Sequence, residues 1–217
     1  MTRIKICGIT NLTDARHALA CGADELGFNF HPASPRFILP AEAAEICIQL
    51  PPNASKVGVF VNAAVSAIGY AVLAVRLDAV QLHGDESAEF VGLLRARIGT
   101  NVKIIKALRV AEHFDTTAAS AFRVEAILLD AFSTKAYGGT GESLDWKRTR
   151  EIRDVLSQDI YLAGGLSAEN VAEAINTARP YAVDACSRLE FAPGIKDAEA
   201  VKNFVAAVRE PYELRAK

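Results

Sequence analysis

The sequence has no long apolar run, no excess of charge of one sign and no closely spaced pair of cysteines. No apolar stretch approaches the roughly 20 residues of a membrane-spanning helix, and the N-terminus lacks the apolar region of a signal peptide. The net charge of −2 argues against a general binder of nucleic acid or membrane surfaces, because neutralising phosphates requires a basic patch. We therefore expect a cytoplasmic protein with no nucleic-acid and no membrane partner.

The four cysteines are scattered, at Cys7, Cys21, Cys47 and Cys186. They form no C-x-x-C pair, and no histidine is spaced as a zinc partner, so the sequence predicts reduced thiols and no metal site. Most free cysteines are small buried apolar residues. Cys7 raises a further alternative, because it ends an apolar run, KIC, and is followed at once by Gly8. It either packs there or presents a thiol for chemistry.

A unit of a short β-rich run, a turn and an Ala-rich amphipathic stretch repeats along the chain. The starts of these runs are roughly 22 to 35 residues apart, the length of a strand and helix with their loops. The predicted strands are 3–7, 25–30, 56–62, 79–84, 103–108, 125–130, 160–165 and 182–187.

Four helices between or after these strands have recognisable ends. In the first, Asn11 or Thr13 is the expected N-cap and Gly22 the C-cap. A second begins near Pro40 and stops before Pro51. The segment 167–180 is predicted as a helix capped by its first residue, a serine, and 196–210 as the last helix.

Eight such units favour a parallel sheet wrapped in helices. Either a closed (β/α)8 barrel or an open doubly wound sheet fits, but no G-x-G-x-x-G follows the first strand. Eight units in 217 residues suit the compact end of the barrel range. Since no linker or low-complexity segment divides the chain, we expect residues 1–217 to form a single (β/α)8 TIM barrel.

Polar residues gather where the predicted strands end, which in such a barrel is the usual place for an active site. They are Cys7, Asn29, His31, Asn62, Gln81, His83, Asp85, Asp130, Gly164, Gly165, Asp184, Cys186 and Ser187. Strand alternation places Lys5 on the same face as Cys7, and Asp184 on the same face as Cys186. His83 is interpreted as a positioning or packing residue rather than a base, and Asp85 and Glu86 as acids favoured before a helix.

Two glycine-rich turns indicate different functions, phosphate binding and movement over a ligand. Gly164 and Gly165 lie between a strand and a helix N-terminus after the seventh strand, where barrels often bind phosphate. The segment GGTGE (138–142) follows the sixth strand and is suited to moving over a ligand.

Eight motifs occur in order along nearly the whole chain: KICGIT (5–10), SPRFI (34–38), GVFVN (58–62), VQLHGDE (80–86), LLDAFS (128–133), GGTGESLDW (138–146), LAGGLSAENV (162–171) and PGIKD (193–197). Together they resemble the phosphoribosylanthranilate isomerases of tryptophan biosynthesis. The resemblance implies an Amadori rearrangement, without cofactor or metal, of N-(5-phosphoribosyl)anthranilate to 1-(2-carboxyphenylamino)-1-deoxyribulose 5-phosphate.

The same resemblance implies roles for single residues. Cys7 is the expected general base and Asp130 the expected general acid, while Arg36 is expected to contact the anthranilate moiety. The phosphate is expected at Gly164, Gly165 and Ser187, and Lys5, His83 and Asp184 are supporting candidates. The only partner expected is this small phosphosugar-anthranilate substrate, in a monomer or a homodimer.

The reaction itself requires one acid, to protonate the ring oxygen, and one base, to remove the C2′ proton. Such a base needs a thiol of lowered pKa, and such an acid needs a carboxyl of raised pKa. Lys5, two residues before Cys7 on the same face, is predicted to stabilise a Cys7 thiolate.

The sequence departs from the family pattern after the eighth strand. Where many members have a Ser-Ser-Gly-like turn, this chain has Cys186, Ser187 and Arg188. Arg188 is expected either to approach the phosphate or to point to solvent. Three alternatives remain: the related isomerase of histidine biosynthesis, which has an aspartate in place of Cys7; indole-glycerol-phosphate synthase, which needs a lysine on an N-terminal extension; and an inactive phosphate-binding barrel.

Overall fold

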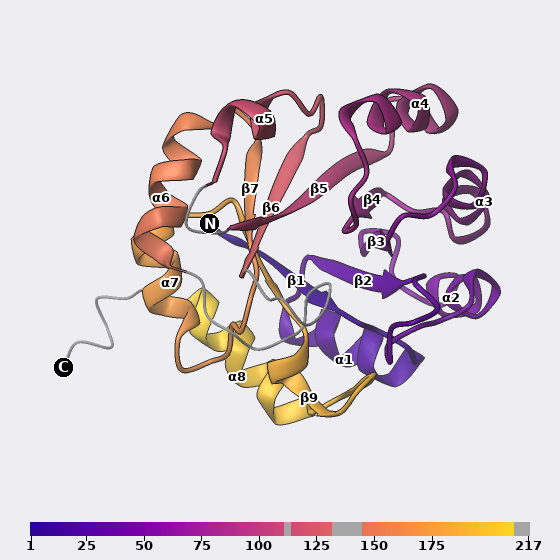
Figure 1. The fold of residues 1–217 in the computed structure, drawn as a ribbon. Coiled ribbons are helices and arrows are strands. Elements are labelled where there is room, and N and C mark those ends of the chain that lie inside the picture. Colours follow the sequence, from indigo (N-terminus) through magenta and orange to yellow (C-terminus); the bar gives the residue numbers. More distant parts are fainter. Residues whose placement is uncertain (111–113, 132–144, 211–217) are drawn as a thin grey trace.

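Eight parallel strands form a closed barrel in the computed structural model, which describes residues 1–110, 114–131 and 145–210 (Figure 1). The strands follow each other around the barrel in chain order: β1 (Arg3–Cys7), β2 (Glu25–Asn29), β3 (Ser55–Phe60), β4 (Ala79–Leu82), β5 (Lys103–Val110), β6 (Ala126–Ala131), β7 (Asp159–Leu162) and β8 (Ala182–Ala185). The barrel closes where β1 pairs with β8, with Lys5 opposite Asp184. The predicted closed barrel is thereby confirmed, and the open sheet is excluded.

Helices surround this barrel and cover the outer side of the strands (Figure 1). They are α1 (Leu12–Cys21), α2 (Pro40–Cys47), α3 (Val65–Val75), α4 (Ala88–Ile98), α5 (Thr116–Ser120), α6 (Trp146–Val155), α7 (Val171–Ala178) and α8 (Ala198–Arg209). At α1 the Asn11 side chain accepts a hydrogen bond from the Asp14 N–H, so Asn11 rather than Thr13 is the N-cap. Gly22 ends α1 with a φ of 107°, a left-handed conformation that glycine adopts without strain.

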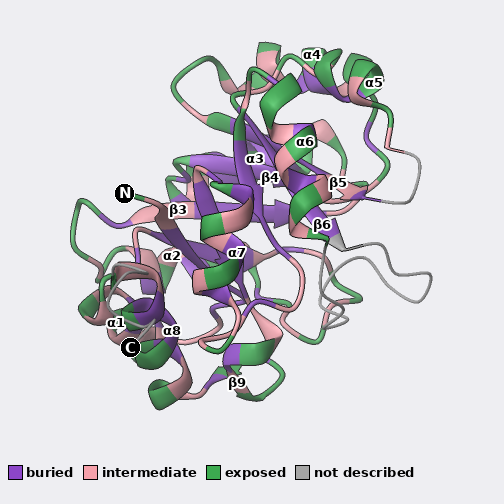
Figure 2. Cartoon of the chain, turned by 90° about the vertical axis from the view of Figure 1, so that its left-hand side faces the viewer, coloured by how far each residue is buried: buried purple, intermediate pink, exposed green. Residues whose placement is uncertain are grey.

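The apolar side chains form two layers. The larger one lies between strands and helices and includes Ile6, Leu82, Leu129 and Phe204, all fully buried. A smaller one fills the barrel interior, from Val57 round to Ala182. Figure 2 shows that the strands are buried along most of their length and that the helices are exposed on their outer faces. The core fills the barrel below the strand ends and holds those ends in fixed positions.

Two segments differ from the sequence-based prediction. Helix α7 begins at Val171 and not at Ser167, because the Ser167 N–H donates to Asn170 Oδ1 and closes a turn instead. A short antiparallel hairpin, β9 (Glu190–Ala192) and β10 (Ile195–Lys196), follows β8, where no strand was predicted. This hairpin brings two buried charged residues, Glu190 and Lys196, to the barrel mouth.

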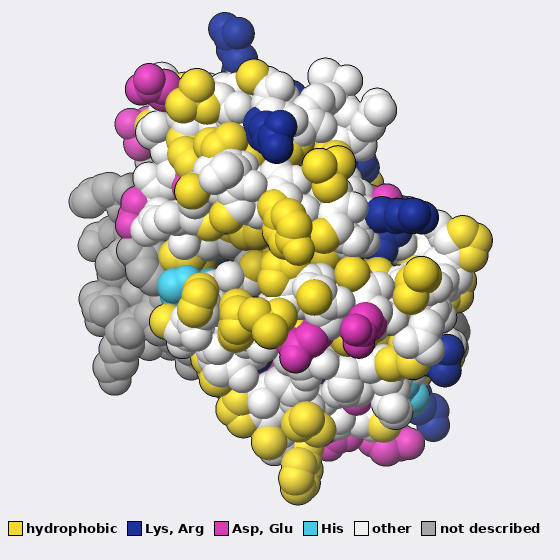
Figure 3. Space-filling model, turned by 90° about the vertical axis from the view of Figure 1, so that its right-hand side faces the viewer, with side chains coloured by type: hydrophobic (Ala, Val, Ile, Leu, Met, Phe, Trp, Pro, Cys, Tyr) yellow, Lys and Arg dark blue, Asp and Glu magenta, His cyan; other side chains and the backbone are white. Residues whose placement is uncertain are grey.

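The outer surface mixes apolar and charged side chains. On the flank drawn in Figure 3, apolar side chains lie between separate groups of basic and acidic ones. Ile48 of the segment after α2, and Tyr70 and Leu73 of α3, are exposed apolar residues. Among the described residues, no helix combines the length and the apolar character needed to cross a bilayer.

Candidate active site

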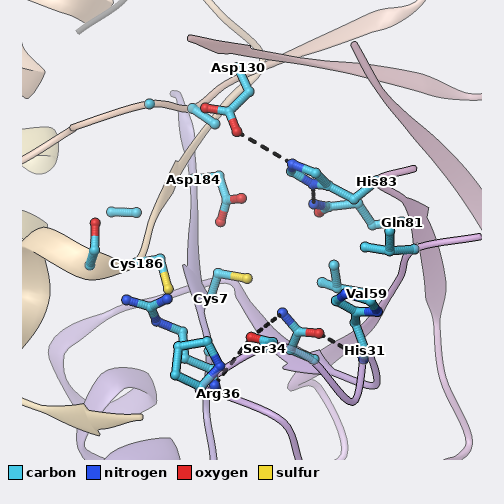
Figure 4. A pocket seen from close by; sticks show the side chains of 18 of the residues that line it. Cys7, His31, Ser34, Arg36, Val59, Gln81, His83, Asp130, Asp184 and Cys186 are labelled. Carbon is cyan, nitrogen blue, oxygen red and sulfur yellow. Dashed lines mark hydrogen bonds and ion pairs between the residues drawn. The ribbon is translucent and has the colours of Figure 1, made fainter. Parts of the chain in front are cut away.

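A cavity of about 310 Å³ opens at the C-terminal ends of the strands. Its walls come from strands and loops around the whole mouth, so residues far apart in sequence meet there. Figure 4 shows Asp130 on one side of this cavity and Arg36 on the other, with Cys7 and Asp184 between them. The side chains that line it include Cys7, Arg36, His83, Asp130, Asp184, Cys186, Ser187 and Arg188, together with Gly164 and Gly165.

Cys7 is the last residue of β1, and its side chain is held in a narrow space. A Cβ added to Gly27, its register partner on β2, would lie 2.8 Å from the Cys7 Sγ, so only a glycine fits opposite. The neighbouring Cys186 thiol lowers the pKa of Cys7 well below its ordinary value; burial opposes this, and the positive charges of Lys5 and Lys196 reinforce it. The site thus favours a thiolate, the nucleophilic and basic form of cysteine.

Lys5 and Asp184 form a buried ion pair beneath the cavity. Lys5 Nζ lies 2.9 Å from Asp184 Oδ1, and the Lys5 side chain is fully buried. Burial opposes the charge of Lys5, but Asp184 and Cys7 outweigh it and raise the lysine pKa. Burial raises the pKa of Asp184 to about 7, although Lys5 acts in the other direction. Asp184 is therefore a second carboxyl group in the cavity, with a pKa above its ordinary value.

Asp130 is held by a histidine on the adjoining side of the mouth. His83 Nε2 lies 3.4 Å from Asp130 Oδ2, and the Gln81 amide nitrogen lies 2.8 Å from His83 Nδ1 (Figure 4). With Gln81 donating to Nδ1, the ring proton lies on Nε2 and faces Asp130. His83 thus contacts the Asp130 carboxyl group, and its role as a positioning residue stays a prediction. The Gln81 Oε1 is buried and has no hydrogen-bond partner among the described residues.

Arg36 projects from the loop after β2 and is fixed by Glu190 of the hairpin. Its Nε lies 2.9 Å from Glu190 Oε1, and its Nη2 lies 2.7 Å from Glu190 Oε2. Lys196 Nζ donates to the same Oε1 at 2.9 Å. Burial would raise the pKa of Glu190, but the hydrogen bond from Arg36 and the charge of Lys196 lower it. This fork geometry fixes the plane of the guanidinium group, which itself lines the cavity.

The turn after β7 has the backbone that two glycines permit. Gly164 has a φ of 90° and Gly165 a φ of 62°, a left-handed region that other residues adopt only with strain. After the neighbouring strand β8, Ser187 and Arg188 belong to a short 3-10 helix, Ser187–Leu189. Arg188 does not adopt a positive φ, so a turn without glycine is accommodated there by a helical backbone. Arg188 is an exposed residue that also borders the cavity.

All the residues to which the resemblance gives a role line this cavity except Lys5, which lies behind it against Asp184. Asn62 and Asp85, also expected at the strand ends of the active site, do not line it. The Asn62 N–H donates to Glu86 Oε1, and Glu86 is itself paired with Lys106 at 2.9 Å. Glu86 is thus a buried ion-pair partner, where the sequence suggested only an acid near a helix start.

Two residues of the site were missed from the sequence, Glu190 and Lys196. Both are charged and nearly fully buried in the hairpin after β8, and the motif PGIKD, which contains Lys196, was the only signal of it. The predicted mobile segment GGTGE (138–142) lies outside the described residues. Within the described ranges, no cluster of three His, Cys, Asp or Glu side chains has the arrangement of a metal site.

Comparison with known proteins gives one consistent result. Residues 4–207 match the family described as PRAI, N-(5'-phosphoribosyl)anthranilate (PRA) isomerase. The chain is 44% identical over 210 residues to the N-(5'-phosphoribosyl)anthranilate isomerase of Pelobacter propionicus, covering 97% of each chain. It is 45% identical over 205 residues to that of Geobacter sulfurreducens, covering 94% of this chain and 97% of the relative.

Solved structures agree with this. The crystal structure of phosphoribosyl anthranilate isomerase from Thermotoga maritima superposes with a TM-score of 0.87 at 40% identity, covering 96% of this chain and 99% of the other. A complex of the isomerase with reduced 1-(o-carboxyphenylamino)-1-deoxyribulose 5-phosphate superposes with a TM-score of 0.84, at the same identity and coverage. The fold, the strand-end cavity and these matches over nearly the whole length lead to one conclusion: the chain belongs to the N-(5'-phosphoribosyl)anthranilate isomerase family.

Proposed function

We propose that the protein isomerises N-(5-phosphoribosyl)anthranilate to 1-(2-carboxyphenylamino)-1-deoxyribulose 5-phosphate in tryptophan biosynthesis, with Cys7 as general base and Asp130 as general acid. The observation that carries the assignment of roles is the placement of a thiol of lowered pKa and a carboxyl group in one cavity, on different strands. An aldose-ketose rearrangement requires this pair of groups and no redox chemistry.

Each group has a defined step. The Asp130 carboxyl, oriented by His83, protonates the ring oxygen of the ribose while the anthranilate nitrogen forms the Schiff base. The Cys7 thiolate then removes the C2′ proton, which gives an enolamine that tautomerises to the ketone. The Lys5–Asp184 ion pair lies beneath Cys7, and the positive charge of Lys5 stabilises the Cys7 thiolate. Because the acid and the base have separate surroundings, each can be tuned without neutralising the other.

The two ends of the substrate fit opposite parts of the mouth. Arg36, fixed by Glu190, provides a cation for the carboxylate of the anthranilate ring. Gly164, Gly165 and Ser187 provide backbone groups and a hydroxyl for the phosphate. Arg188 lies on the same side of the cavity and adds a positive charge where the family pattern has glycine.

The direct test is conversion of freshly prepared phosphoribosylanthranilate, with products identified by mass-resolved chromatography. The wild-type protein is expected to give the isomeric ketose. Cys7→Ala and Asp130→Asn are each expected to lose about 10²–10⁴-fold in kcat, the usual size of a general acid or base contribution. Cys47→Ala is the matched control, because Cys47 ends α2 and does not line the cavity.

Formation of anthranilate alone, by spontaneous hydrolysis, in both the wild type and the variants would contradict the isomerase assignment. In that case a phosphate-binding barrel without this activity becomes the better interpretation. Calorimetric titration with inorganic phosphate would then measure the affinity of the protein for phosphate. Full activity of Cys7→Ala would leave the reaction in place and remove Cys7 as the base.

The protein is expected to act as a monomer or a homodimer in the cytoplasm. A related isomerase from Thermotoga maritima, with 39% identity and a TM-score of 0.83, is described as dimeric and was crystallised in monomeric form. Light scattering of the purified protein distinguishes one barrel of 23.3 kDa from two. Cell fractionation tests the location: the protein is expected in the soluble cytoplasmic fraction and not in the periplasmic or membrane fractions.

A further inference from the structure

Gln81 of β4 lines the active-site cavity, and the proposed mechanism gives it no role. It is only 1% exposed, and His83, two residues further along the chain, lines the same cavity. The register partners of Gln81 on β3 and β5 are Val59 and Ile105, which are buried and apolar. A buried glutamine among such neighbours needs a polar partner for its amide group.

The side-chain amide of Gln81 is held at one end only. Its nitrogen lies 2.8 Å from His83 Nδ1, and in the part of the chain that the structure describes this is the only hydrogen bond of the amide. The Gln81 Oε1 is buried and has no partner there. A buried carbonyl oxygen without a donor is costly, and an apolar side chain of similar length avoids that cost. The contact with His83 therefore explains the amide better than packing does.

The bond from Gln81 decides which ring nitrogen of His83 carries the proton. An amide nitrogen can only donate, so Nδ1 accepts and the proton of the neutral ring is on Nε2. His83 Nε2 lies 3.4 Å from Asp130 Oδ2 (Figure 4). Contacts of this kind are often long without substrate and shorten in its complex. The three side chains thus form a chain with one direction, from the amide through the imidazole to the carboxyl group.

We propose that Gln81 is a positioning residue for Asp130: through His83 it keeps an N–H group on the Oδ2 side of that carboxyl, so that the transferable proton is held on Oδ1. A carbonyl oxygen accepts a hydrogen bond better than a hydroxyl oxygen does. The Nε2–H group therefore favours the acid form in which Oδ2 is the carbonyl oxygen and Oδ1 the hydroxyl.

The proton then moves from one defined atom, Asp130 Oδ1, to the ribose ring oxygen. The Nε2–H group of His83 remains in place and stabilises the carboxylate that this transfer leaves. The importance of Gln81 for catalysis rests on the proposed function, in which Asp130 is the acid.

The tautomer of His83 is measured in the protein without substrate, by NMR of the two ring nitrogens above the pH at which the ring loses its charge. In the wild type, Nδ1 is expected to be bare and Nε2 to be protonated. Gln81→Glu keeps the shape of the side chain, but an ionised carboxylate only accepts, so the proton is expected on Nδ1. His83→Gln identifies the signals. Those of His17 on α1 are the internal control, because its ring contacts the Ala198 carbonyl oxygen outside the cavity.

Steady-state kinetics give a second readout. Gln81→Met has a similar length and no donor, and is expected to lower kcat about tenfold with little change in KM, the effect of one hydrogen bond lost from a transition state. Gln81→Glu is expected to lower kcat further, because it holds the ring proton on the opposite nitrogen. Gln158→Met is the matched control and is expected to keep its kcat. The Gln158 Oε1 is also buried and unpaired among the described residues, but its amide donates to the Phe122 carbonyl oxygen, away from the cavity.

Three results would each overturn the proposal: a wild-type ring with its proton on Nδ1, an unchanged tautomer in Gln81→Glu, or a folded Gln81→Met enzyme as active as the wild type. The last would make Gln81 a packing residue. Gln81→Leu replaces Gln81→Met if that variant does not fold. Because the NMR measurement needs no substrate, these tautomer results are separate from failure of the wild type to isomerise phosphoribosylanthranilate, which would contradict only the proposed function.

Discussion

Lys5 is a fully buried cation next to the proposed base, so its effect on Cys7 can be measured directly. Lys5→Met keeps the length of the side chain and removes the charge. The pKa of Cys7 is expected to rise, and alkylation of Cys7 near neutral pH is expected to slow at least about tenfold, since one pKa unit is a tenfold change in thiolate. Alkylation of Cys21 and Cys47 in the same sample serves as the internal control. An unchanged Cys7 profile would remove Lys5 from the mechanism.

Glu190 fixes the orientation of the Arg36 guanidinium group. Substitution of Glu190 is therefore expected to change substrate binding (KM) more than the chemical step (kcat). Glu190→Gln leaves Arg36 and Lys196 without their anionic partner. The KM for phosphoribosylanthranilate is expected to rise about tenfold with a much smaller change in kcat, because the guanidinium group contacts the anthranilate end in both ground and transition states. Steady-state kinetics measure this. A fall in kcat with unchanged KM would instead place Glu190 in the chemical step.

The same substitution has a stability effect with a definite pH dependence. The pKa of Glu190 is lowered in the folded protein, so its charged form stabilises the fold above the ordinary carboxyl pKa, and this contribution disappears as pH falls through the folded value. Removing one partner of a buried ion pair costs roughly 3–5 kcal/mol. Glu190→Gln is therefore expected to be much less stable than the wild type at about pH 7, with the difference shrinking below about pH 4.5 in urea unfolding. If the free energies of unfolding of the wild type and Glu190→Gln differed by the same amount at all these pH values, the lowered pKa of Glu190 would be contradicted.

At this scale, the sequence could predict the residues whose positions follow from strand alternation. The period of two placed Lys5 with Cys7 and Asp184 with Cys186, and the structure has both arrangements. Glu190 could not be placed in this way, because it lies in an irregular hairpin whose contact with Arg36 joins residues 154 positions apart. The interaction is long-range, and no local pattern encodes it.

Gly27 of strand β2 leaves space for the side chain of Cys7, the proposed base, so adding one methyl group at this position is expected to disturb the base. A Cβ on Gly27 would lie 2.8 Å from the Cys7 Sγ and 3.2 Å from Lys5 Nζ. Gly27→Ala is expected to displace the Cys7 side chain and to reduce kcat at least about 10²-fold, because small displacements of a reacting group have effects of that size. The far-UV circular dichroism of the folded barrel is expected to remain. Activity within a factor of two of the wild type would show that Cys7 tolerates the movement.

Gly92 in α4 is the matched control for this substitution. An added Cβ there meets nothing within 4 Å among the described residues, and the position lies inside a helix. Gly92→Ala is expected to leave activity unchanged and to raise the free energy of unfolding by about 0.5–1 kcal/mol, since alanine loses less conformational entropy in a helix. Urea unfolding measures this difference.

The elements themselves were largely predictable, because apolar runs bounded by turns recur in a regular order. All eight strands begin within one residue of the predicted position. The predicted ends lie too late for β2, β3, β4, β7 and β8 and too early for β5 and β6, because the predictions for the first five took in residues of the loops that follow these strands. The β9–β10 hairpin is too short, at three and two residues, to leave a periodic signal.

Closure of the barrel joins the two ends of the chain. Strand β1 pairs with β8, α1 packs against α8, and Arg209 at the end of α8 donates hydrogen bonds to the Thr2 and Gly22 carbonyl oxygens. It also pairs with Asp24 at 2.8 Å. The two halves of the chain share the β1–β8 and β4–β5 pairings, and a single domain stays a prediction.

A single cooperative unfolding transition is therefore expected for the whole chain. Circular dichroism at peptide and aromatic wavelengths is expected to give one midpoint, and the calorimetric enthalpy, about 150 kcal/mol for 217 residues at the usual value per residue, is expected to equal the van't Hoff enthalpy. Arg209→Ala weakens the contact between the ends and is expected to lower the midpoint without splitting the transition. Two separate transitions in either protein would show that parts of the barrel unfold independently. A single shifted transition would instead place the last helix, α8, in the same cooperative unit as the strand that carries Cys7.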